Sequence, residues 1–299
     1  MRRTSRRGLL RHGSGAEPMA SVAAADAASR APAPRRDTLL DVESLTLRFG
    51  GVRAVDGVSI SISEGEIFSV IGPNGAGKTS LVNCVTGYYR PNEGLVRFAG
   101  EDITRRPTYR IARAGIARTY QNIELFQGLS VIDNLLVGRH RHMRANVVTG
   151  GLWFGPSRRE ELRERRVVEE LVDFLEIAHV RNVPVGKLPY GIQKRVDLGR
   201  ALAVEPRLLI LDEPMAGMNI EEKEDIARFV LEAQAERDLT ILLIEHDMGV
   251  VMDISDRIAV LDFGKLIAQG RPEQIKDDPA VIEAYVGGKA LADRDLVPG

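Results

Sequence analysis

Residues 72–79 of this chain read Gly72-Pro73-Asn74-Gly75-Ala76-Gly77-Lys78-Thr79, which matches the pattern G-x-x-x-x-G-K-[ST] of a phosphate-binding loop. The glycines let backbone N–H groups curl around a chain of phosphates, and the helix that follows adds the partial positive charge of its N-terminus. Lys78 can reach the outer phosphates, the Thr79 hydroxyl can hold Mg²⁺, and we expect Ser80 to contact the nucleotide as well. The stretch therefore predicts a binding site for ATP or GTP with Mg²⁺.

The segments on either side of this glycine loop (residues 72–79) give it a functional context. An apolar run at residues 66–71 leads in and predicts a buried strand, and a helical run at residues 78–86 leads out and ends at Gly87. False matches to the pattern mostly lack this order of strand, loop and helix. We therefore interpret the loop as a phosphate site and not as a glycine-rich turn that binds nothing.

Composition sets the broad class of the protein. With 44% hydrophobic and 28% charged residues, the chain of 299 residues is ordinary for a globular protein. A single cysteine, Cys84, excludes an internal disulfide and suits a reducing compartment. No apolar run approaches the length of a membrane span, so we expect none. A net charge of −1 gives no overall signal for nucleic acid, and we expect no nucleic-acid partner.

The N-terminal end of the chain differs from the rest in composition. Residues 1–36 carry a net charge of +6 from eight arginines and two acidic residues, and they are rich in Ala, Ser and Pro without apolar periodicity. This composition predicts a disordered basic tail. Arg6-Arg7 superficially resembles a twin-arginine export signal, but no apolar segment follows, so we expect no export. A short C-terminal tail is expected at residues 288–299, after a last helix at residues 279–285.

Strands and helices alternate in the part between, residues 37–287, which predicts an α/β fold. With its glycine loop, this part resembles the P-loop NTPase class. Apolar or alternating runs predict strands at residues 39–49, 58–62, 95–98, 115–118, 208–211, 240–244, 258–261 and 265–268. Helices are expected at residues 131–143, 190–203 and 220–236, and from a capping box at Ser157 and Glu160 onward. We expect a mixed, largely parallel core sheet, a small antiparallel β subdomain, and a helical subdomain inserted at about residues 124–203.

Two acidic residues follow the apolar strand predicted at residues 208–211. This strand delivers Asp212 and Glu213 to the C-terminal edge of the sheet, where α/β sheets bind their ligands. Asp212 is placed to act on Mg²⁺, directly or through its water, and Glu213 to polarise an attacking water. Such a pair alone is often no more than two acids in a turn, but beside a phosphate-binding loop it predicts nucleotide hydrolysis.

Two further polar side chains are expected at the same edge. His246 follows the strand predicted at residues 240–244, which should neighbour the strand that carries Asp212, so its imidazole would lie near a γ-phosphate. Gln121 follows the strand predicted at residues 115–118 and opens the helical insert. Its neutral amide can hold Mg²⁺ or the attacking water and can report occupancy of the site to the insert.

In order and spacing, these elements resemble the ATPase subunit of an ABC transporter over about residues 37–287. The resemblance rests on the glycine loop, Gln121, residues 188–195 (LPYGIQKR), Asp212-Glu213, residues 215–219 (MAGMN) and His246. Within that superfamily the chain is most similar to the ATPases of branched-chain (hydrophobic) amino acid importers. This closer likeness rests on residues 48–51 (RFGG), 115–122 (GIARTYQN), 245–248 (EHDM), 272–275 (PEQI) and 281–287 (VIEAYVG).

The resemblance implies a mechanism that one chain cannot complete. Two ATPase subunits, identical or different, would sandwich two ATP molecules head to tail, each with Mg²⁺, and the glycine loop of one would face residues 188–192 of the other. Phe49 would stack on adenine, Glu213 would activate water, His246 would hold the γ-phosphate, and Asn219 would lie near the dimer seam. Closure on ATP would drive two permease subunits fed by a solute-binding protein, at the cytoplasmic face of the inner membrane.

The signature loop (residues 188–192) departs from the superfamily pattern L-S-G-G-Q. After Leu188, Pro189 replaces Ser, Tyr190 replaces Gly, Gly191 remains, and Ile192 replaces Gln. In most relatives the Ser hydroxyl would reach the γ-phosphate held by the other subunit, whereas Pro189 has neither a hydroxyl nor an N–H. Pro189 does suit the start of the next helix. We hypothesise that N–H groups at this helix start, chiefly that of Gly191, replace the lost donor; the alternative is a weaker site.

Together these inferences predict an ATP-hydrolysing, energy-coupling subunit of an importer for branched-chain or related amino acids. Two alternatives stay open: the ATPase of a lipid or lipopolysaccharide exporter, and a non-transport ATPase of DNA repair or chromosome maintenance. Residues 216–219 and 245–248 favour the importer over the exporter. The insert is too short for a coiled coil and Cys84 offers no zinc site, which argues against the repair ATPases.

Overall fold

A computed structural model describes residues 37–140 and 156–292, with the side chains of residues 37–140 and 161–285. The basic tail predicted at residues 1–36 lies outside the described residues, as do residues 141–155 and 293–299. Residues 288–292, which we expected to be part of a C-terminal tail, belong to a helix instead.

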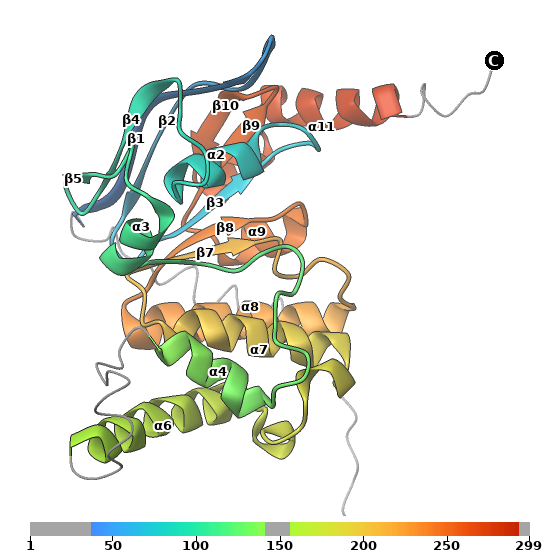
Figure 1. Ribbon diagram of the computed structural model, residues 1–299. Helices are drawn as coiled ribbons and strands as arrows, with labels where there is room; N and C mark the ends of the chain where they lie inside the picture. The colour runs from blue at the N-terminus through green and yellow to red at the C-terminus, as the bar shows by residue number, and fades with distance from the viewer. Residues whose placement is uncertain (1–36, 141–155, 293–299) are drawn as a thin grey trace, which may run out of the picture. The chain divides into compact units, whose positions relative to one another are not determined.

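A six-stranded sheet carries the glycine loop (Figure 1). Neighbouring strands pair in parallel except for β9 and β10, which form an antiparallel hairpin. Strands β3, β7 and β8 are buried along their whole length because both faces of the sheet are covered, which explains their unbroken apolar sequences. The mixed, largely parallel sheet is confirmed. Its strands, in spatial order, are β10 (Lys265–Gly270), β9 (Arg257–Asp262), β3 (Ile67–Ile71), β8 (Thr240–Ile244), β7 (Leu208–Asp212) and β6 (Ile116–Arg118).

A second sheet is antiparallel, as expected, and has four strands. Its spatial order is β2 (Val52–Ser63), β1 (Thr38–Phe49), β4 (Glu93–Phe98) and β5 (Glu101–Asp102). Strand β2 begins earlier than the alternating run at residues 58–62 suggested, because its first half pairs with the end of β1. Leu47 pairs with Val55 and Phe49 pairs with Val52, which shows this extension of β2.

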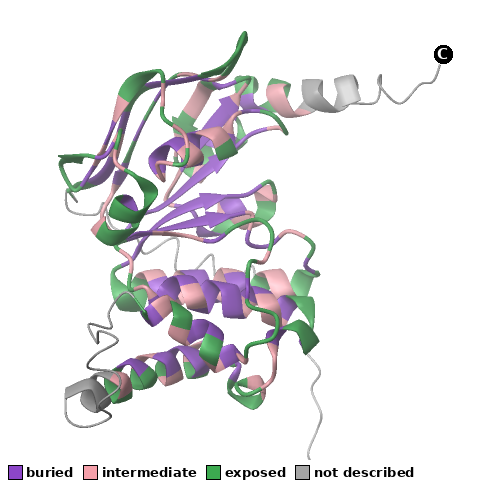
Figure 2. Ribbon diagram, in the orientation of Figure 1, coloured by how far each residue is buried: buried purple, intermediate pink, exposed green. Residues whose placement is uncertain are grey.

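The core sheet separates two hydrophobic cores, and alternate residues of each strand enter different cores. Figure 2 shows that the central strands of this sheet are buried. Phe68 and Val70 of β3 face a core shared with the second sheet and with helix α2 (Lys78–Val85). Ile67 and Ile71 face a core shared with the helices of the other side. Those helices include α8 (Ile220–Arg237) and α9 (Met248–Ile254), and the remaining helices of the core unit are α3 (Thr108–Ala114), α10 (Pro272–Lys276) and α11 (Pro279–Ala292).

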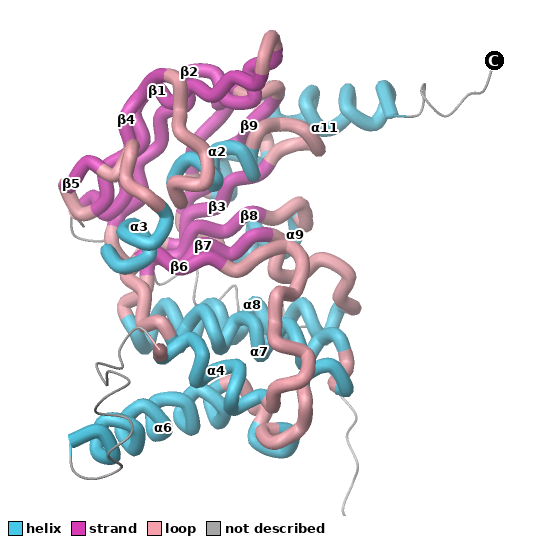
Figure 3. Tube along the Cα trace, in the orientation of Figure 1, coloured by secondary structure: helices cyan, strands magenta, loops and turns pink. Residues whose placement is uncertain are grey.

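Within its described residues, the predicted helical insert has three helices and two short 3₁₀ turns. Figure 3 shows its helices packed beside α8. The helices are α4 (Val131–Arg139), α6 (Pro156–Phe174) and α7 (Tyr190–Ala203), and the turns are Ala178–Val180 and Val185–Lys187. Arg139 of α4 is buried and donates to Glu164 of α6 at 2.5 Å, which joins the two helices. Helix α7 has its predicted bounds. No helix within the described residues is long and apolar enough to cross a membrane.

Helix α6 already includes Pro156, so Ser157 lies inside the helix and is not its N-cap. The predicted capping box was therefore wrong in position, and the side chains of Ser157 and Glu160 lie outside the described residues. A proline is well suited to the first turn of a helix, which accounts for the earlier start.

Candidate functional site

The glycine loop joins the end of β3 to the start of α2, and main chain from other strands encloses two of its glycines. A Cβ atom on Gly72 would lie 2.1 Å from the carbonyl oxygen of Leu261, and one on Gly77 would lie 2.3 Å from that of Ala54. Gly77 also has a φ of 100°, which residues with a side chain rarely adopt. Neither position accepts a larger residue, so the backbone of the loop stays bare.

Backbone hydrogen bonds brace the loop from behind. The N–H of Gly264, in the turn between β9 and β10, donates to the carbonyl oxygen of Ala76 at 3.0 Å. The carbonyl oxygen of Gly264 accepts from the N–H of Asp56 in β2 at 2.8 Å. These bonds connect the loop to the hairpin and to the second sheet, so its shape is set by main chain on several sides.

Lys78 holds its ammonium group inside the loop. Nζ donates to the carbonyl oxygens of Gly72 and Pro73 at 2.6 and 3.0 Å, and the residue is buried. Burial lowers the pKa of Lys78, while the carboxylates of Glu213 and Asp212 act in the opposite direction. A buried cation in this position suits phosphate oxygens, because their charge would offset the cost of its desolvation.

The outer side of the loop is open. Asn74, Gly75 and Thr79 are exposed and Ser80 is half-buried. A Cβ atom on Gly75 would meet no atom of the described chain within 4 Å. Backbone N–H groups, the Thr79 hydroxyl and the Lys78 ammonium thus line a cradle of the kind that a triphosphate with Mg²⁺ requires.

A buried ion pair lies beside the loop, and the sequence did not reveal it. Arg118 Nη2 at the end of β6 lies 2.6 Å from Asp212 Oδ2 at the end of β7, and the two side chains are 9% and 6% exposed. Arg118 Nη1 also donates to Asn83 Oδ1 in α2 at 2.6 Å, and the guanidinium lies 5.0 Å from the centroid of the Tyr120 ring. Asp212 therefore lies at the predicted edge, paired with a cation from the next strand.

Gln121 and Glu213 are in direct contact. Gln121 Nε2 donates to Glu213 Oε2 at 2.8 Å, and the N–H of Glu213 donates to the carbonyl oxygen of Ile244 at 2.8 Å. Glu213 has a φ of 47°, a left-handed conformation that costs a non-glycine residue about 1–2 kcal/mol. Such a conformation persists only where the surroundings impose it, so the position of this carboxylate is built into the fold.

Glu245 is a buried carboxylate to which the sequence pattern assigned no role. Its Oε1 accepts from the N–H of Met215 at 2.9 Å and its Oε2 from the N–H of His246 at 3.1 Å. Burial raises the pKa of Glu245, and these two N–H groups oppose the rise. The residue joins the ends of β7 and β8, which are adjacent as predicted, while the His246 side chain is 58% exposed.

Phe49, which we expected to stack on adenine, lies at the end of β1 in the second sheet. It is 47% exposed, and its ring packs edge-on against Tyr89 with centroids 5.1 Å apart. One aromatic neighbour therefore holds the ring while the rest of it stays open, an arrangement that leaves a π-face available for stacking.

The signature loop has an unexpected acidic neighbour. Pro189 is exposed and extended, and α7 begins at Tyr190 without a side-chain cap from Pro189. Gly191 is buried against Glu222, because a Cβ atom on Gly191 would lie 2.2 Å from Glu222 Oε1. The same carboxylate completes a capping box with Asn219 at the start of α8. An anion that approaches Gly191 would therefore also meet the negative charge of Glu222.

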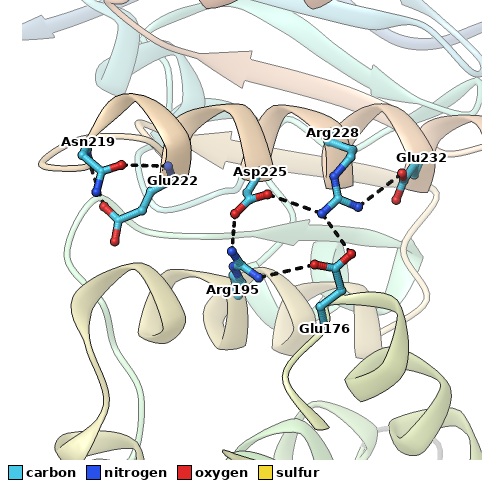
Figure 4. A network of polar contacts seen from close by, with 7 residues as sticks. All are labelled: Glu176, Arg195, Asn219, Glu222, Asp225, Arg228 and Glu232. Atoms are coloured by element: carbon cyan, nitrogen blue, oxygen red, sulfur yellow. Dashed lines mark hydrogen bonds and ion pairs between the residues drawn. The ribbon is translucent and has the colours of Figure 1, made fainter. Parts of the chain in front are cut away.

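A network of charged residues holds α7 against α8 (Figure 4). Arg195 of α7 pairs with Asp225 of α8, and it lies 3.9 Å from Glu176, which follows α6. Arg228 of α8 lies 3.1 Å from Glu176 and 3.4 Å from Asp225. The guanidinium of Arg228 also lies 4.4 Å from the centroid of the Phe229 ring. Helix α7 is thus attached to α8, which is the helix that follows Asp212 and Glu213 along the chain.

A groove of about 1210 Å³ runs between the core unit and the helical insert. Residues of both parts line it, including Thr79, Arg118 and Tyr120 from the core unit and Val137 and Ala201 from the insert. Its aromatic side chains are exposed: Tyr88, Tyr109 and Tyr120.

Comparison with known families agrees with this geometry. Residues 55–216 match the family model described as ABC transporter, and residues 265–290 match the model described as branched-chain amino acid ATP-binding cassette transporter. The chain belongs to the ABC transporter family. The predicted family is confirmed, and the second match lies in the C-terminal region of this ABC subunit.

Two curated bacterial proteins are similar to this ABC subunit along most of its length. It is 43% identical over 249 residues to the high-affinity branched-chain amino acid transport ATP-binding protein BraF of Pseudomonas aeruginosa, a match that covers 83% of this chain and 98% of that protein. It is 42% identical over 252 residues to the corresponding protein LivG of Escherichia coli, with the same coverage. Both relatives are named for amino acid transport, as the sequence predicted, and not for lipid export or DNA repair.

Solved structures of related cassettes confirm the fold. A nucleotide-free ATP-binding cassette from an ABC transporter has a TM-score of 0.72 and 34% identity, and the match covers 83% of this chain and 99% of that cassette. A cassette in its ADP conformation has a TM-score of 0.72 and 33% identity, covering 84% and 99%. A dimeric cassette bound to ADP and phosphate, 22% identical with a TM-score of 0.66, shares the fold. The roles of individual site residues stay predictions.

Proposed function

We propose that this ABC subunit hydrolyses ATP and thereby powers a transporter that imports branched-chain or related amino acids. One observation carries the enzymatic part: Gln121 and Glu213 are in contact at the sheet edge that also carries Asp212, beside a glycine loop lined by Lys78. The amino acid class is supported by the likeness to the transport proteins BraF and LivG.

Each part of the site has a separate task in this proposal. The backbone of residues 72–79 and the Lys78 ammonium bind the triphosphate, and Phe49 stacks on the adenine. Thr79, Asp212 and Gln121 hold Mg²⁺, which when bound neutralises charge on the phosphates. Glu213 accepts the proton of the attacking water, and the exposed imidazole of His246 donates a hydrogen bond to the γ-phosphate.

The residues that the sequence did not reveal support these tasks. Arg118 holds Asp212 through Oδ2 and so fixes the orientation of the carboxylate that would bind Mg²⁺. Glu245 fixes the main chain on both sides of the site, through Met215 after Glu213 and through His246. Both roles are orienting ones, because neither side chain needs to touch the nucleotide.

We propose that a second ATPase subunit completes each site with its residues 188–192. The observation in favour is the exposure of Pro189 and Ile220, which leaves the start of α7 and the start of α8 free for a neighbouring subunit. A related cassette with ADP and phosphate is dimeric. The N–H groups at the start of α7 would then contact the γ-phosphate held by the other subunit, in spite of the nearby Glu222.

We propose that the groove between the core unit and the insert binds a cytoplasmic segment of a permease subunit. Tyr88, Tyr109 and Tyr120 offer exposed aromatic surface there, of the kind enriched at protein interfaces. An occupant would touch Thr79 next to the phosphates and the insert at once. The subunit would therefore act at the cytoplasmic face of the inner membrane, attached to two permeases and served by a solute-binding protein.

Exchange of the catalytic carboxylate tests the proposed hydrolysis. In the assembled transporter, Glu213→Gln should lower ATP turnover by about 100-fold or more, because the general base is lost while the amide preserves size. Binding of ATP should persist. Glu236→Gln, an exposed residue of α8, is the matched control and should leave turnover unchanged. A Glu213→Gln complex that turns over like the wild type would refute the assignment.

The transported solute needs a separate measurement. Cells that lack this subunit should lose energised uptake of leucine, isoleucine and valine, and expression of the wild-type chain should restore it. The Glu213→Gln chain should not restore uptake. Restored uptake of an unrelated solute, with no change for these three amino acids, would replace the solute class and leave the ATPase assignment intact.

A further inference from the structure

Tyr190 reaches from the signature loop to the chain segment that follows Glu213. Its hydroxyl donates to the carbonyl oxygen of Ala216 at 3.2 Å, and its ring packs on Gly217, where a Cβ atom would lie 3.5 Å from Cε1. The N–H of Ala216 in turn donates to the carbonyl oxygen of Glu213 at 3.2 Å. A side chain at a position where the superfamily pattern has glycine thus holds the turn that begins at Glu213.

Lys194 lies one helical turn further along α7 and contacts Gln121, whose side chain is hydrogen-bonded to Glu213. Its Nζ donates to the carbonyl oxygen of Gln121 at 3.0 Å, and the side chain of Gln121 donates to Glu213. Lys194 is buried, and its ammonium lies 5.7 Å from the centroid of the Tyr190 ring, within the range of a cation–π contact. The main chain that presents the Gln121 amide is therefore held by a buried cation of α7.

Two separate paths thus lead from the first turns of α7 to one carboxylate. The first runs from Tyr190 through Ala216 to the main chain of Glu213, and the second runs from Lys194 through Gln121 to its side chain. The two paths approach Glu213 from different segments of the chain, so together they restrain both its backbone and its carboxylate.

Helix α7 is itself firmly placed, which lets it act as a platform. Arg195 joins it to α8 in the network of Figure 4. Arg200 Nη1 donates to the carbonyl oxygen of Glu124 at 2.6 Å, and Arg200 Nη2 pairs with the buried Asp197 at 2.8 Å. The segment that begins at Gln121 is therefore held by α7 at two points, Lys194 and Arg200.

We infer that Tyr190 and Lys194 are positioning residues that orient Glu213 for attack on the γ-phosphate. The inference rests on the proposed function, in which the start of α7 contacts the nucleotide bound by the other subunit. Helix α7, whose start contacts the nucleotide bound by the other subunit, then orients the Glu213 carboxylate that acts on the nucleotide bound by its own subunit. Occupancy of one site is thereby linked to the geometry of the other through contacts within a single chain.

The two side chains suit this task for chemical reasons. A hydroxyl and an ammonium group on neighbouring turns donate to carbonyl oxygens, so they hold main chain and leave the side chains of Gln121 and Glu213 available. The superfamily pattern has glycine in place of Tyr190, which offers no such donor. The departure from L-S-G-G-Q thus adds a contact through Tyr190 and does not only remove the serine hydroxyl at Pro189.

Steady-state kinetics of the assembled transporter tests the inference. Tyr190→Phe removes only the hydroxyl, and Lys194→Met removes only the ammonium. Each should lower kcat about 3- to 10-fold, the effect of one lost hydrogen bond, while KM for ATP and the affinity for ADP stay within about twofold. If the two paths act separately, the kcat of the double variant should fall by about 10- to 100-fold. Lys276→Met, an exposed lysine of α10, is the control for loss of a lysine.

A second pair of measurements separates positioning from simple destabilisation. Lys194→Arg should recover most of the kcat lost in Lys194→Met, because a guanidinium can also donate to the Gln121 carbonyl oxygen. Hydrogen exchange of the amides of residues 213–216 should become faster in Tyr190→Phe, while the glycine loop keeps its protection. If Lys194→Met does not fold, Tyr190→Phe still decides the question through its kcat and its hydrogen exchange.

The results that would contradict this inference differ from those that would contradict the proposed function. If Glu213→Gln abolishes turnover and both Tyr190→Phe and Lys194→Met keep kcat within twofold of wild type, the positioning roles are overturned and the ATPase assignment stands. A wild-type complex whose turnover does not depend on Glu213 would overturn both. A fall in ADP affinity equal to the fall in kcat would also overturn the inference, because it would indicate a general loss of structure.

Discussion

The glycine loop and the start of α7 are proposed to contact the same kind of nucleotide, yet they are held in different ways. The neighbours of the glycine loop are backbone atoms: the carbonyl oxygens of Leu261 and Ala54, and the N–H of Gly264. The start of α7 is held by side chains, through the Tyr190 hydroxyl and the Lys194 ammonium. A site built on backbone tolerates few substitutions, whereas a site built on side chains can be rebuilt with other residues.

This difference explains why one region follows its sequence pattern and the other departs from it. The pattern G-x-x-x-x-G-K-[ST] survives because a Cβ atom at Gly72 or Gly77 would collide with main chain that cannot move away. At residues 189–192 only Gly191 keeps the superfamily residue, and a Cβ atom there would collide with Glu222. The positions on either side carry Pro189, Tyr190 and Ile192.

The largest expected effect is at the backbone of the glycine loop. Gly77→Ala should destabilise the fold by about 3 kcal/mol or more, because it adds a collision with the Ala54 carbonyl oxygen to the cost of a positive φ. Gly100→Ala is a matched control, since Gly100 has a φ of 78° but nothing within 4 Å of its Cβ position in the described chain, and it should cost about 1–2 kcal/mol. Urea unfolding measures both, and equal losses would show that the backbone contact is unimportant.

Removal of Arg118 should have the next largest effect. Arg118→Met leaves the Asp212 carboxylate buried without its cation, which should cost about 3 kcal/mol of unfolding free energy. Adding Asp212→Asn should recover part of that loss, because the unpaired charge is then gone. Arg105→Met, at an exposed arginine, is the control and should cost less than about 0.5 kcal/mol. An equal loss in the single and double variants would contradict the charge explanation.

A smaller effect with a distinct pH dependence is expected at Glu245, which lies between the two regions. Burial raises its pKa above the ordinary value of 4.5, so the folded protein binds this proton more tightly than the unfolded chain does. The stability it contributes is fully present below pH 4.5 and is lost as the pH rises through the folded pKa. Glu245→Gln keeps only one of the two oxygen acceptors for the N–H groups of Met215 and His246. The substitution should therefore lower the free energy of unfolding by about 1 kcal/mol near pH ~4.5.

The cost of Glu245→Gln should therefore shrink as the pH rises from about 4.5 to about 7.5. Urea unfolding of the variant and the wild type at several pH values gives this difference directly. Glu236→Gln, at an exposed glutamate, should show no such trend. A cost that stays constant across this range would mean that the protonation of Glu245 does not differ between the folded and unfolded states.

The sequence predicted those parts of the site that depend on strand ends. Asp212, Glu213, His246 and Gln121 follow apolar runs, and parallel strands bring their C-terminal ends to one edge, so these side chains were expected at that edge. The direct contact between Gln121 and Glu213 was not predicted. The fold class followed from the alternation of strands and helices in the same way. These inferences need only the period of the pattern and the topology of the sheet.

The remaining contacts could not be predicted, because they depend on how helices pack and which rotamers result. Lys194 and Gln121 are 73 residues apart in sequence, and no local pattern links them. The same holds for Arg118 with Asp212, 94 residues apart. Glu222 was recognisable as part of a helix start, but its position against Gly191 follows only from the packing of α7 on α8.

The smallest expected effect is at Pro189, and it tests the comparison most directly. If the start of α7 is held by side chains and its N–H groups contact the nucleotide, a serine hydroxyl at this position is not needed. Pro189→Ser should then change the ATP turnover of the assembled transporter by less than about twofold. Serine also suits a position before a helix, so the fold should tolerate it. A large gain in turnover would mean that the loop is a weakened form of L-S-G-G-Q, and that the N–H groups at the start of α7 do not replace the missing hydroxyl.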